Sequence, residues 1–111
     1  MGVVYLLGDS LKEGFYKIGV TRGSIEKRIK KLQTGNAGEI YLVNSFETNH
    51  PFILEKMLHN RYFGKQAMGE WYELCDDDVI NFTKICESLQ TNIDFLIENN
   101  FYFQKKFGGT N

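Results

Sequence analysis

The segment Val3–Val20, VVYLLGDSLKEGFYKIGV, decides the fold. It contains two apolar runs, Val3–Leu7 and Phe15–Val20, that are rich in the β-branched and aromatic residues typical of buried strands. The intervening stretch contains the turn signals Gly8, Asp9, Ser10 and Gly14. Two strands this close in sequence, separated by a turn, predict an antiparallel hairpin.

Two helices and a further strand are predicted after the hairpin. Residues 24–35 open with a serine suited to an N-cap, repeat isoleucine and leucine at helical spacing, and end in a glycine. Residues 40–46 alternate loosely in hydrophobicity, which predicts a third strand. Pro51 suits a first helical turn, so residues 52–63 are expected to form the second helix.

The last third of the chain is predicted to be mainly helical. A short extended segment at residues 69–74 is followed by one helix over residues 76–89, a second over 92–98 and a frayed tail at 107–111. The order β-β-α-β-α-β-α predicts an α+β fold, in which a small, mainly antiparallel three-stranded sheet is flanked by helices.

The size of the chain, 111 residues, predicts a single domain. We assign residues 1–80 to the domain proper and residues 81–111 to a helical extension packed on it, with a flexible tail. Cys75 and Cys86 have no ligand-type spacing, which predicts reduced thiols and no structural zinc. Neither a secretion signal nor an apolar stretch of about 20 residues is visible, so a cytoplasmic protein without a membrane partner is expected.

Charge is distributed unevenly along the chain, although the net charge is only −1. Residues 1–35 carry seven basic and three acidic side chains, a local charge of about +4, whereas residues 70–98 carry one basic and eight acidic ones, about −7. A phosphate-binding surface is therefore expected in the first third. On charge alone, a solvated helix face explains the same basic residues equally well.

Several short motifs follow one another in a definite order along the chain. Val3-Val4-Tyr5 is followed after ten residues by Tyr16-Lys17-Ile18-Gly19, and then by a helix that carries Arg28. Further motifs follow at residues 32–36 (LQTGN), 54–63 (LEKMLHNRYF) and 69–72 (GEWY). In this order the motifs resemble those of the GIY-YIG nucleases. The combination is most similar to the phage-type branch, in which the second motif contains KIG, and it covers roughly residues 2–80.

The sequence departs from the family pattern at two places. Val3 stands where the first motif has glycine, and Lys17 stands where the second has tyrosine, with Tyr16 just before it. Strand alternation puts Tyr16 and Lys17 on opposite faces, so only one of them can point at a site. The register of the family favours Lys17 and leaves the role of Tyr16 open.

The resemblance implies a metal-dependent endonuclease that hydrolyses DNA phosphodiester bonds in a bacterial or phage-infected cell. It implies Glu55 as the ligand of Mg²⁺ or Mn²⁺ and Tyr5 as the group that activates water. A phenol with an ordinary pKa of about 10 needs a nearby cation for this task. Lys17 can be that cation, and it can stabilise the phosphate together with Arg28. His59 can contact the phosphate, relay a proton or orient Glu55.

Each of these residues also has an ordinary structural explanation when taken singly. Tyr5 can be a half-buried strand aromatic, Lys17 a solvent-facing lysine and Arg28 a stem lying along the apolar surface. Glu55 and His59, one helical turn apart, can be a plain surface pair. The motif context favours the catalytic interpretation over these alternatives.

Contacts to DNA are expected from the first helix and the turn after it. The lysines would bind phosphates without reading sequence, and the polar residues would contact DNA or serve only as a helix cap and turn. The residues are Lys27, Lys30, Lys31, Gln33, Thr34 and Asn36.

Two other functions stay open at this level. The first is a catalytically weak, nuclease-derived DNA-binding or regulatory module; the second is a protein-interaction domain that uses the acidic last third. The low net charge favours a partner or a structured substrate, and a homodimer or a protein partner is a candidate source of specificity.

Overall fold

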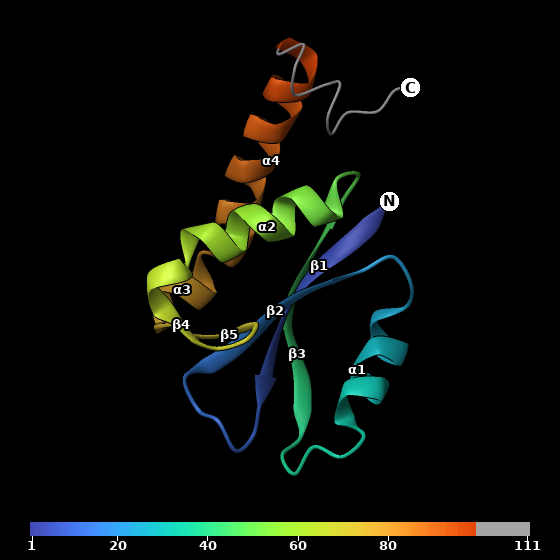
Figure 1. Ribbon diagram of the computed structural model, residues 1–111, viewed down its shortest axis with the longest axis vertical. Helices are drawn as coiled ribbons and strands as arrows, with labels where there is room; N and C mark the ends of the chain where they lie inside the picture. Colours follow the sequence, from blue (N-terminus) through green and yellow to red (C-terminus); the bar gives the residue numbers. More distant parts are fainter. Residues whose placement is uncertain (100–111) are drawn as a thin grey trace.

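A five-stranded antiparallel sheet forms the centre of the computed structural model, which describes residues 1–99. Its strands lie in the order β3-β1-β2-β5-β4 (Figure 1). Their bounds are β1 Gly2–Asp9, β2 Phe15–Thr21, β3 Ile40–Thr48, β4 Gln66–Met68 and β5 Trp71–Glu73. The α+β class and the hairpin of β1 with β2 are therefore confirmed.

The predicted strand count of three was too low. The three-residue strand β5 pairs with the edge of β2, and β4 pairs in turn with β5. All three residues of β4 are exposed. A strand that buries no side chain leaves no alternation of apolar and polar residues in the sequence, so periodicity could not indicate it.

Four α-helices and one short 3₁₀ turn complete the fold: α1 Ile25–Gln33, α2 Pro51–Arg61, η1 Phe63–Lys65, α3 Asp76–Ile80 and α4 Phe82–Asn99. The start and the end of α1 follow the sequence signals. The side-chain oxygen of Ser24 accepts a hydrogen bond from the backbone N–H of Lys27, as an N-cap does. Just after the helix, Gly35 has a φ of 77°, a left-handed conformation that glycine adopts without strain.

The last third differs from the prediction in where its helices break. The chain bends at Asn81, whose side chain donates to the carbonyl of Asp77 and ends α3. No break occurs near residue 91, because the hydroxyl of Thr91 bonds back to the carbonyl of Glu87 and is satisfied inside the helix. The predicted helices over 76–89 and 92–98 are therefore replaced by α3 and a continuous α4. The predicted flexible tail, residues 107–111, lies outside the described residues.

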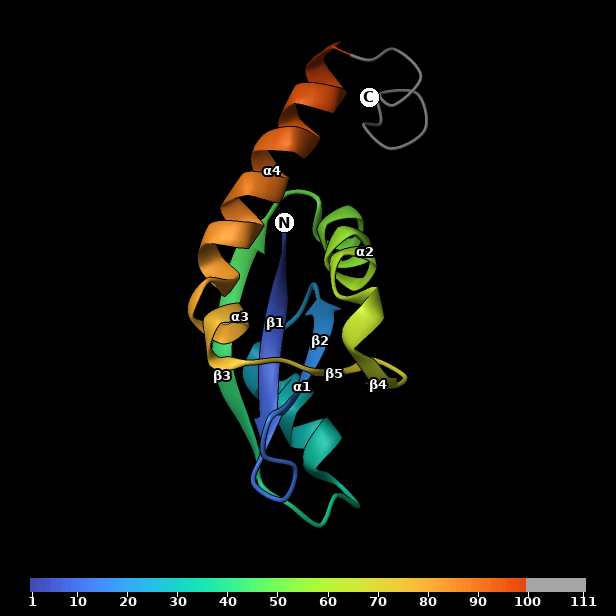
Figure 2. The same ribbon diagram turned by 90° about the vertical axis from the view of Figure 1, so that its left-hand side faces the viewer.

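Two apolar clusters lie on the two faces of the sheet. The main core lies under α2 and α4, and its buried members are Val4, Leu6, Ile18, Leu54, Leu58, Tyr62, Tyr72, Leu74, Phe82, Cys86 and Ile93. The α1 cluster contains the buried residues Tyr5, Leu7 and Ile40, with Ile29, Leu32 and Trp71 packed against them. Figure 2 shows α2 running beside β2 and α4 beside β3.

The described part of the chain also bears on two smaller predictions. Cys75 and Cys86 are both free, and burial raises the pKa of the Cys86 thiol to about 12. Among residues 1–99, no helix combines the length and the apolar character that crossing a membrane requires.

Candidate active site

Tyr5 and Arg28 meet on the α1 side of the sheet. The Tyr5 side chain points to this side because its neighbours Val4 and Leu6 occupy the main core on the other. The Nε–H of Arg28 donates to the hydroxyl oxygen of Tyr5 at 3.2 Å, and this contact is the main reason that the pKa of Arg28 is raised. A guanidinium in this place stabilises negative charge on the phenol oxygen or on a bound anion.

Gly19 makes the space for this tyrosine. Gly19 is the register partner of Tyr5 across the β1–β2 hairpin. A Cβ atom added at position 19 would lie 2.5 Å from the hydroxyl oxygen of Tyr5. Only a residue without a side chain fits beneath the ring, so the hairpin register fixes both positions together.

Lys17 lies on the same face of β2 as Gly19. Its register partner in β1 is Leu7, a member of the α1 cluster. Tyr16, on the opposite face, packs against the main core. The structure therefore directs Lys17 toward the site and Tyr16 away from it. The Nζ of Lys17 forms an ion pair of 3.2 Å with a carboxylate oxygen of Glu70.

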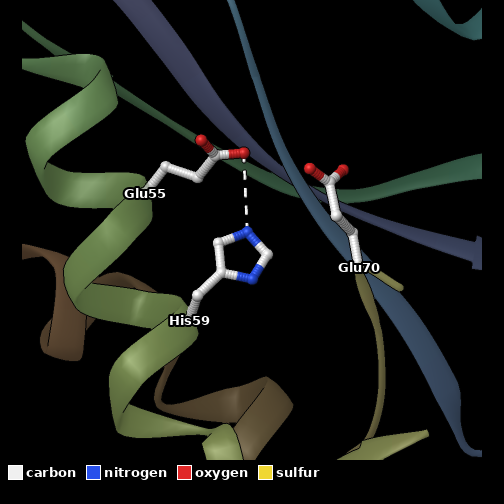
Figure 3. Close-up of side chains that lie close together, drawn as sticks. All are labelled: Glu55, His59 and Glu70. Atoms are coloured by element: carbon white, nitrogen blue, oxygen red, sulfur yellow. Dashed lines mark ion pairs between the residues drawn. The ribbon is translucent and has the colours of Figure 1, made fainter. Parts of the chain in front are cut away.

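Helix α2 supplies Glu55 and His59, which lie one turn apart and point toward Glu70 (Figure 3). The Nε2 of His59 is 3.5 Å from a carboxylate oxygen of Glu55. Its Nδ1 is in contact with the hydroxyl of Tyr72 on β5. When the ring proton is on Nδ1, it is donated to the hydroxyl of Tyr72, and the lone pair of Nε2 then faces the carboxylate of Glu55.

The pKa of Glu55 depends on its burial and on the charged side chains around it. Burial, followed by the negative charge of Glu70, raises the pKa of Glu55, while His59 and Lys17 act in the opposite direction. Both carboxylates also contribute to the raised pKa of Arg28. Helix α2, strand β2 and helix α1 therefore bring their charged side chains within electrostatic reach of one another.

Glu55, His59 and Glu70 together could hold a metal ion, since one ligand atom from each lies within 4.8 Å of the others. Nε2 of His59 is buried and has no hydrogen-bond partner in the part of the chain that the structure describes. A buried nitrogen without a hydrogen-bond partner, facing two carboxylates, could serve as part of the donor set of a divalent cation. Carboxylates suit Mg²⁺ and Mn²⁺, and the added imidazole nitrogen favours transition-metal ions over Mg²⁺.

The residues predicted to contact DNA fall into two groups. Lys27, Lys30, Lys31 and Thr34 are exposed on α1 and at its end. The amides of Gln33 and Asn36 instead close the turn that follows: both donate to the carbonyl of Gly38 at 2.8 Å, and the Gln33 oxygen accepts from the N–H of Ile40. These bonds correspond to the cap-and-turn alternative for the two residues, and DNA contact by all six residues stays a prediction.

Glu70 and Tyr72 were not predicted as site residues, although both lie in the GEWY motif. Glu70 reaches Lys17, and Tyr72 reaches His59, because β5 pairs with β2 in a register that places Trp71 opposite Lys17. This pairing joins segments more than fifty residues apart, and no local pattern predicts it. The one available signal was the glutamate within the short extended segment predicted at residues 69–74.

A small α+β domain that brings a tyrosine, an arginine and a lysine within electrostatic reach of a carboxylate–histidine cluster (Glu55, His59 and Glu70) fits a nuclease-like module. The comparison with protein families gives the same class: the chain belongs to the T5orf172 domain family, whose model matches residues 2–87. The match ends within α4. Neither a curated protein nor a solved structure matches the chain.

Proposed function

We propose that this protein is a metal-dependent endonuclease of the GIY-YIG type that hydrolyses DNA phosphodiester bonds. The observation that carries the proposal is the hydrogen bond from Arg28 to the hydroxyl of Tyr5, next to two carboxylates and a histidine that suit a divalent cation. Membership of a nuclease-like family supports it as well.

Phosphodiester hydrolysis needs a water molecule that loses a proton, and it needs positive charge around the phosphate. Tyr5 orients the water and takes its proton as a phenolate, which the guanidinium of Arg28 stabilises, and becomes the neutral phenol in that step. Arg28 and Lys17 then neutralise the charge that develops on the phosphate oxygens. Glu55, oriented by His59, would hold Mg²⁺ or Mn²⁺, which supplies Lewis-acid stabilisation of the phosphate and of the leaving oxygen.

A second candidate function is a nuclease-derived DNA-binding or regulatory module with little cleavage. The observation in its favour is that Tyr5 is only 1% exposed, with its hydroxyl already bonded to Arg28. In the endonuclease, DNA binding has to make this buried hydroxyl accessible to the attacking water before it can act. A module that only binds DNA would not need that change.

Nicking of supercoiled plasmid in the presence of Mg²⁺ or Mn²⁺ separates the two functions. We expect Glu55→Gln to abolish nicking while DNA binding persists, because the variant loses a charged ligand and keeps its shape. Glu87→Gln, an exposed glutamate on α4, is the matched control and should nick as the wild type does. A wild-type protein that binds DNA without nicking it under any metal condition would favour the DNA-binding module.

A further inference from the structure

The backbone of Glu70 is held in a fixed place next to Glu55 and His59. Gly69, with a φ of 56°, turns the chain directly before it. The carbonyl of Glu70 accepts a hydrogen bond of 3.1 Å from the N–H of Ile18, which anchors its backbone to β2. The side chain is 48% exposed, so its carboxylate can change partners while its backbone stays in place.

The carboxylate of Glu70 lies between two kinds of neighbour. On one side is the ammonium of Lys17, at 3.2 Å. On the other are Glu55 and His59, whose ligand atoms lie within 4.8 Å of its own. Two carboxylates so close repel each other, and a positive charge near both is favourable.

We infer, on the basis of the proposed function, that Glu70 is a second carboxylate ligand of the divalent cation and that Lys17 is its counter-ion until the cation binds. Cation binding then frees the ammonium of Lys17 for the DNA phosphate. An ion pair with one partly exposed partner contributes little to stability, so this exchange of partners is easily made. Glu70 thereby couples occupation of the metal site to preparation of the phosphate site.

Titration calorimetry with Mn²⁺ on the whole chain, in the absence of DNA, tests this inference without measuring cleavage. We expect Glu70→Gln to weaken Mn²⁺ binding by about tenfold or more, because a charged ligand becomes neutral. We expect Lys17→Met to tighten Mn²⁺ binding about threefold or more, because the competing cation is gone. Glu73→Gln, an exposed glutamate three residues after Glu70 at the end of β5, is the matched control and should bind as the wild type does.

Thermal unfolding in a chelating buffer confirms that each variant is folded before its affinity is compared. If Glu70→Gln bound Mn²⁺ as tightly as the wild type while Glu55→Gln did not bind it, the inference would be overturned and the metal-dependent function would stand. Weaker or unchanged binding by Lys17→Met would overturn the proposed exchange of partners. A wild-type chain that takes up no Mn²⁺ would overturn the inference together with the metal dependence of the proposed function.

Discussion

The two faces of the central sheet differ although the same strands build both. On β1, Val4 and Leu6 are fully buried in the main core, while the intervening Tyr5 carries a hydroxyl to Arg28. On β2, Ile18 enters the main core while Lys17 reaches Glu70. On these two strands, the main-core face therefore carries only packed apolar side chains, and the α1 face positions the polar groups of Tyr5 and Lys17. A register slip of one residue would exchange the two sets, so the stability of one face fixes the chemistry of the other.

The largest expected effect on the nicking rate comes from removing one oxygen atom, the hydroxyl of Tyr5. Tyr5→Phe keeps the ring above Gly19 but loses the hydroxyl, so the nicking rate should fall by about 10²- to 10⁴-fold, the range for a lost general base. Stability should change by no more than about 1.5 kcal/mol, the net value of one hydrogen bond. Single-turnover nicking and urea unfolding measure the two quantities. Nicking at the wild-type rate would exclude Tyr5 from the reaction.

The opposite pattern is expected one residue further along β1. Leu6→Ala opens a cavity in the main core and should lower the free energy of unfolding by about 2–5 kcal/mol. The nicking rate of the folded fraction should stay close to that of the wild type, because Leu6 faces away from the site. Urea unfolding gives the stability, and nicking scaled to the folded fraction gives the rate. If both variants lost activity and stability alike, the division between the two faces would be false.

Asp9, on the same face of β1 as Tyr5, predicts a pH effect on stability. Its carboxylate is buried and accepts hydrogen bonds from the side chain of Asn36 at 3.0 Å and from the N–H of Leu11 at 2.9 Å. The bond from Asn36, followed by that from Leu11, lowers the pKa of Asp9 below its ordinary value. This stabilisation is complete above the unfolded-state pKa and is lost as the pH falls through the lower folded-state pKa.

Asp9→Asn should accordingly lower the free energy of unfolding by about 1–3 kcal/mol at pH 7, the range for hydrogen bonds to a charged group. The difference from the wild type should shrink as the pH falls toward 3. Urea unfolding at both pH values measures it. A difference that stayed constant with pH would show that the charge of Asp9 does not contribute.

The smallest expected effect concerns DNA affinity. Lys30→Ala removes an exposed charge from α1, so binding should weaken several-fold and its salt dependence should fall by about one unit of log K against log salt concentration. The matched control is Lys84→Ala, an exposed lysine on α4 at the main-core side of the sheet. Fluorescence anisotropy at several salt concentrations measures both variants. Equal effects of the two substitutions would mean that DNA does not prefer the α1 side.

The parts of the site that the sequence predicted are those controlled by local periodicity. Alternation along β2 required that Tyr16 and Lys17 face opposite ways, and pairing with β1 sends Lys17 to the side of Tyr5. Helical spacing likewise put Glu55 and His59 on one side of α2. Given the hairpin and the two helices, these positions follow without further information.

The remaining parts of the site and the fold depend on contacts between segments that are distant in sequence, or on hydrogen bonds made by a side chain that the sequence alone leaves ambiguous. Glu70 reaches Lys17 only because β5 joins the edge of β2. The continuity of α4 through Thr91 depends on a side-chain bond to the preceding turn, which composition does not reveal. The amide of Gln33 was equally suited to DNA or to the turn, and its three hydrogen bonds within the turn are visible only in three dimensions.

Tyr5 and Gly19 lie opposite each other in the hairpin, so protein engineering has to change the two positions together. In a library that randomises position 19 alone, clones that retain a correctly seated ring should carry glycine, because even a methyl group would overlap the phenol oxygen. A library that randomises both positions should yield compensated pairs, with a smaller residue at 5 and a larger one at 19. Such pairs would fill the same volume and fold, yet they would carry no phenol for the reaction.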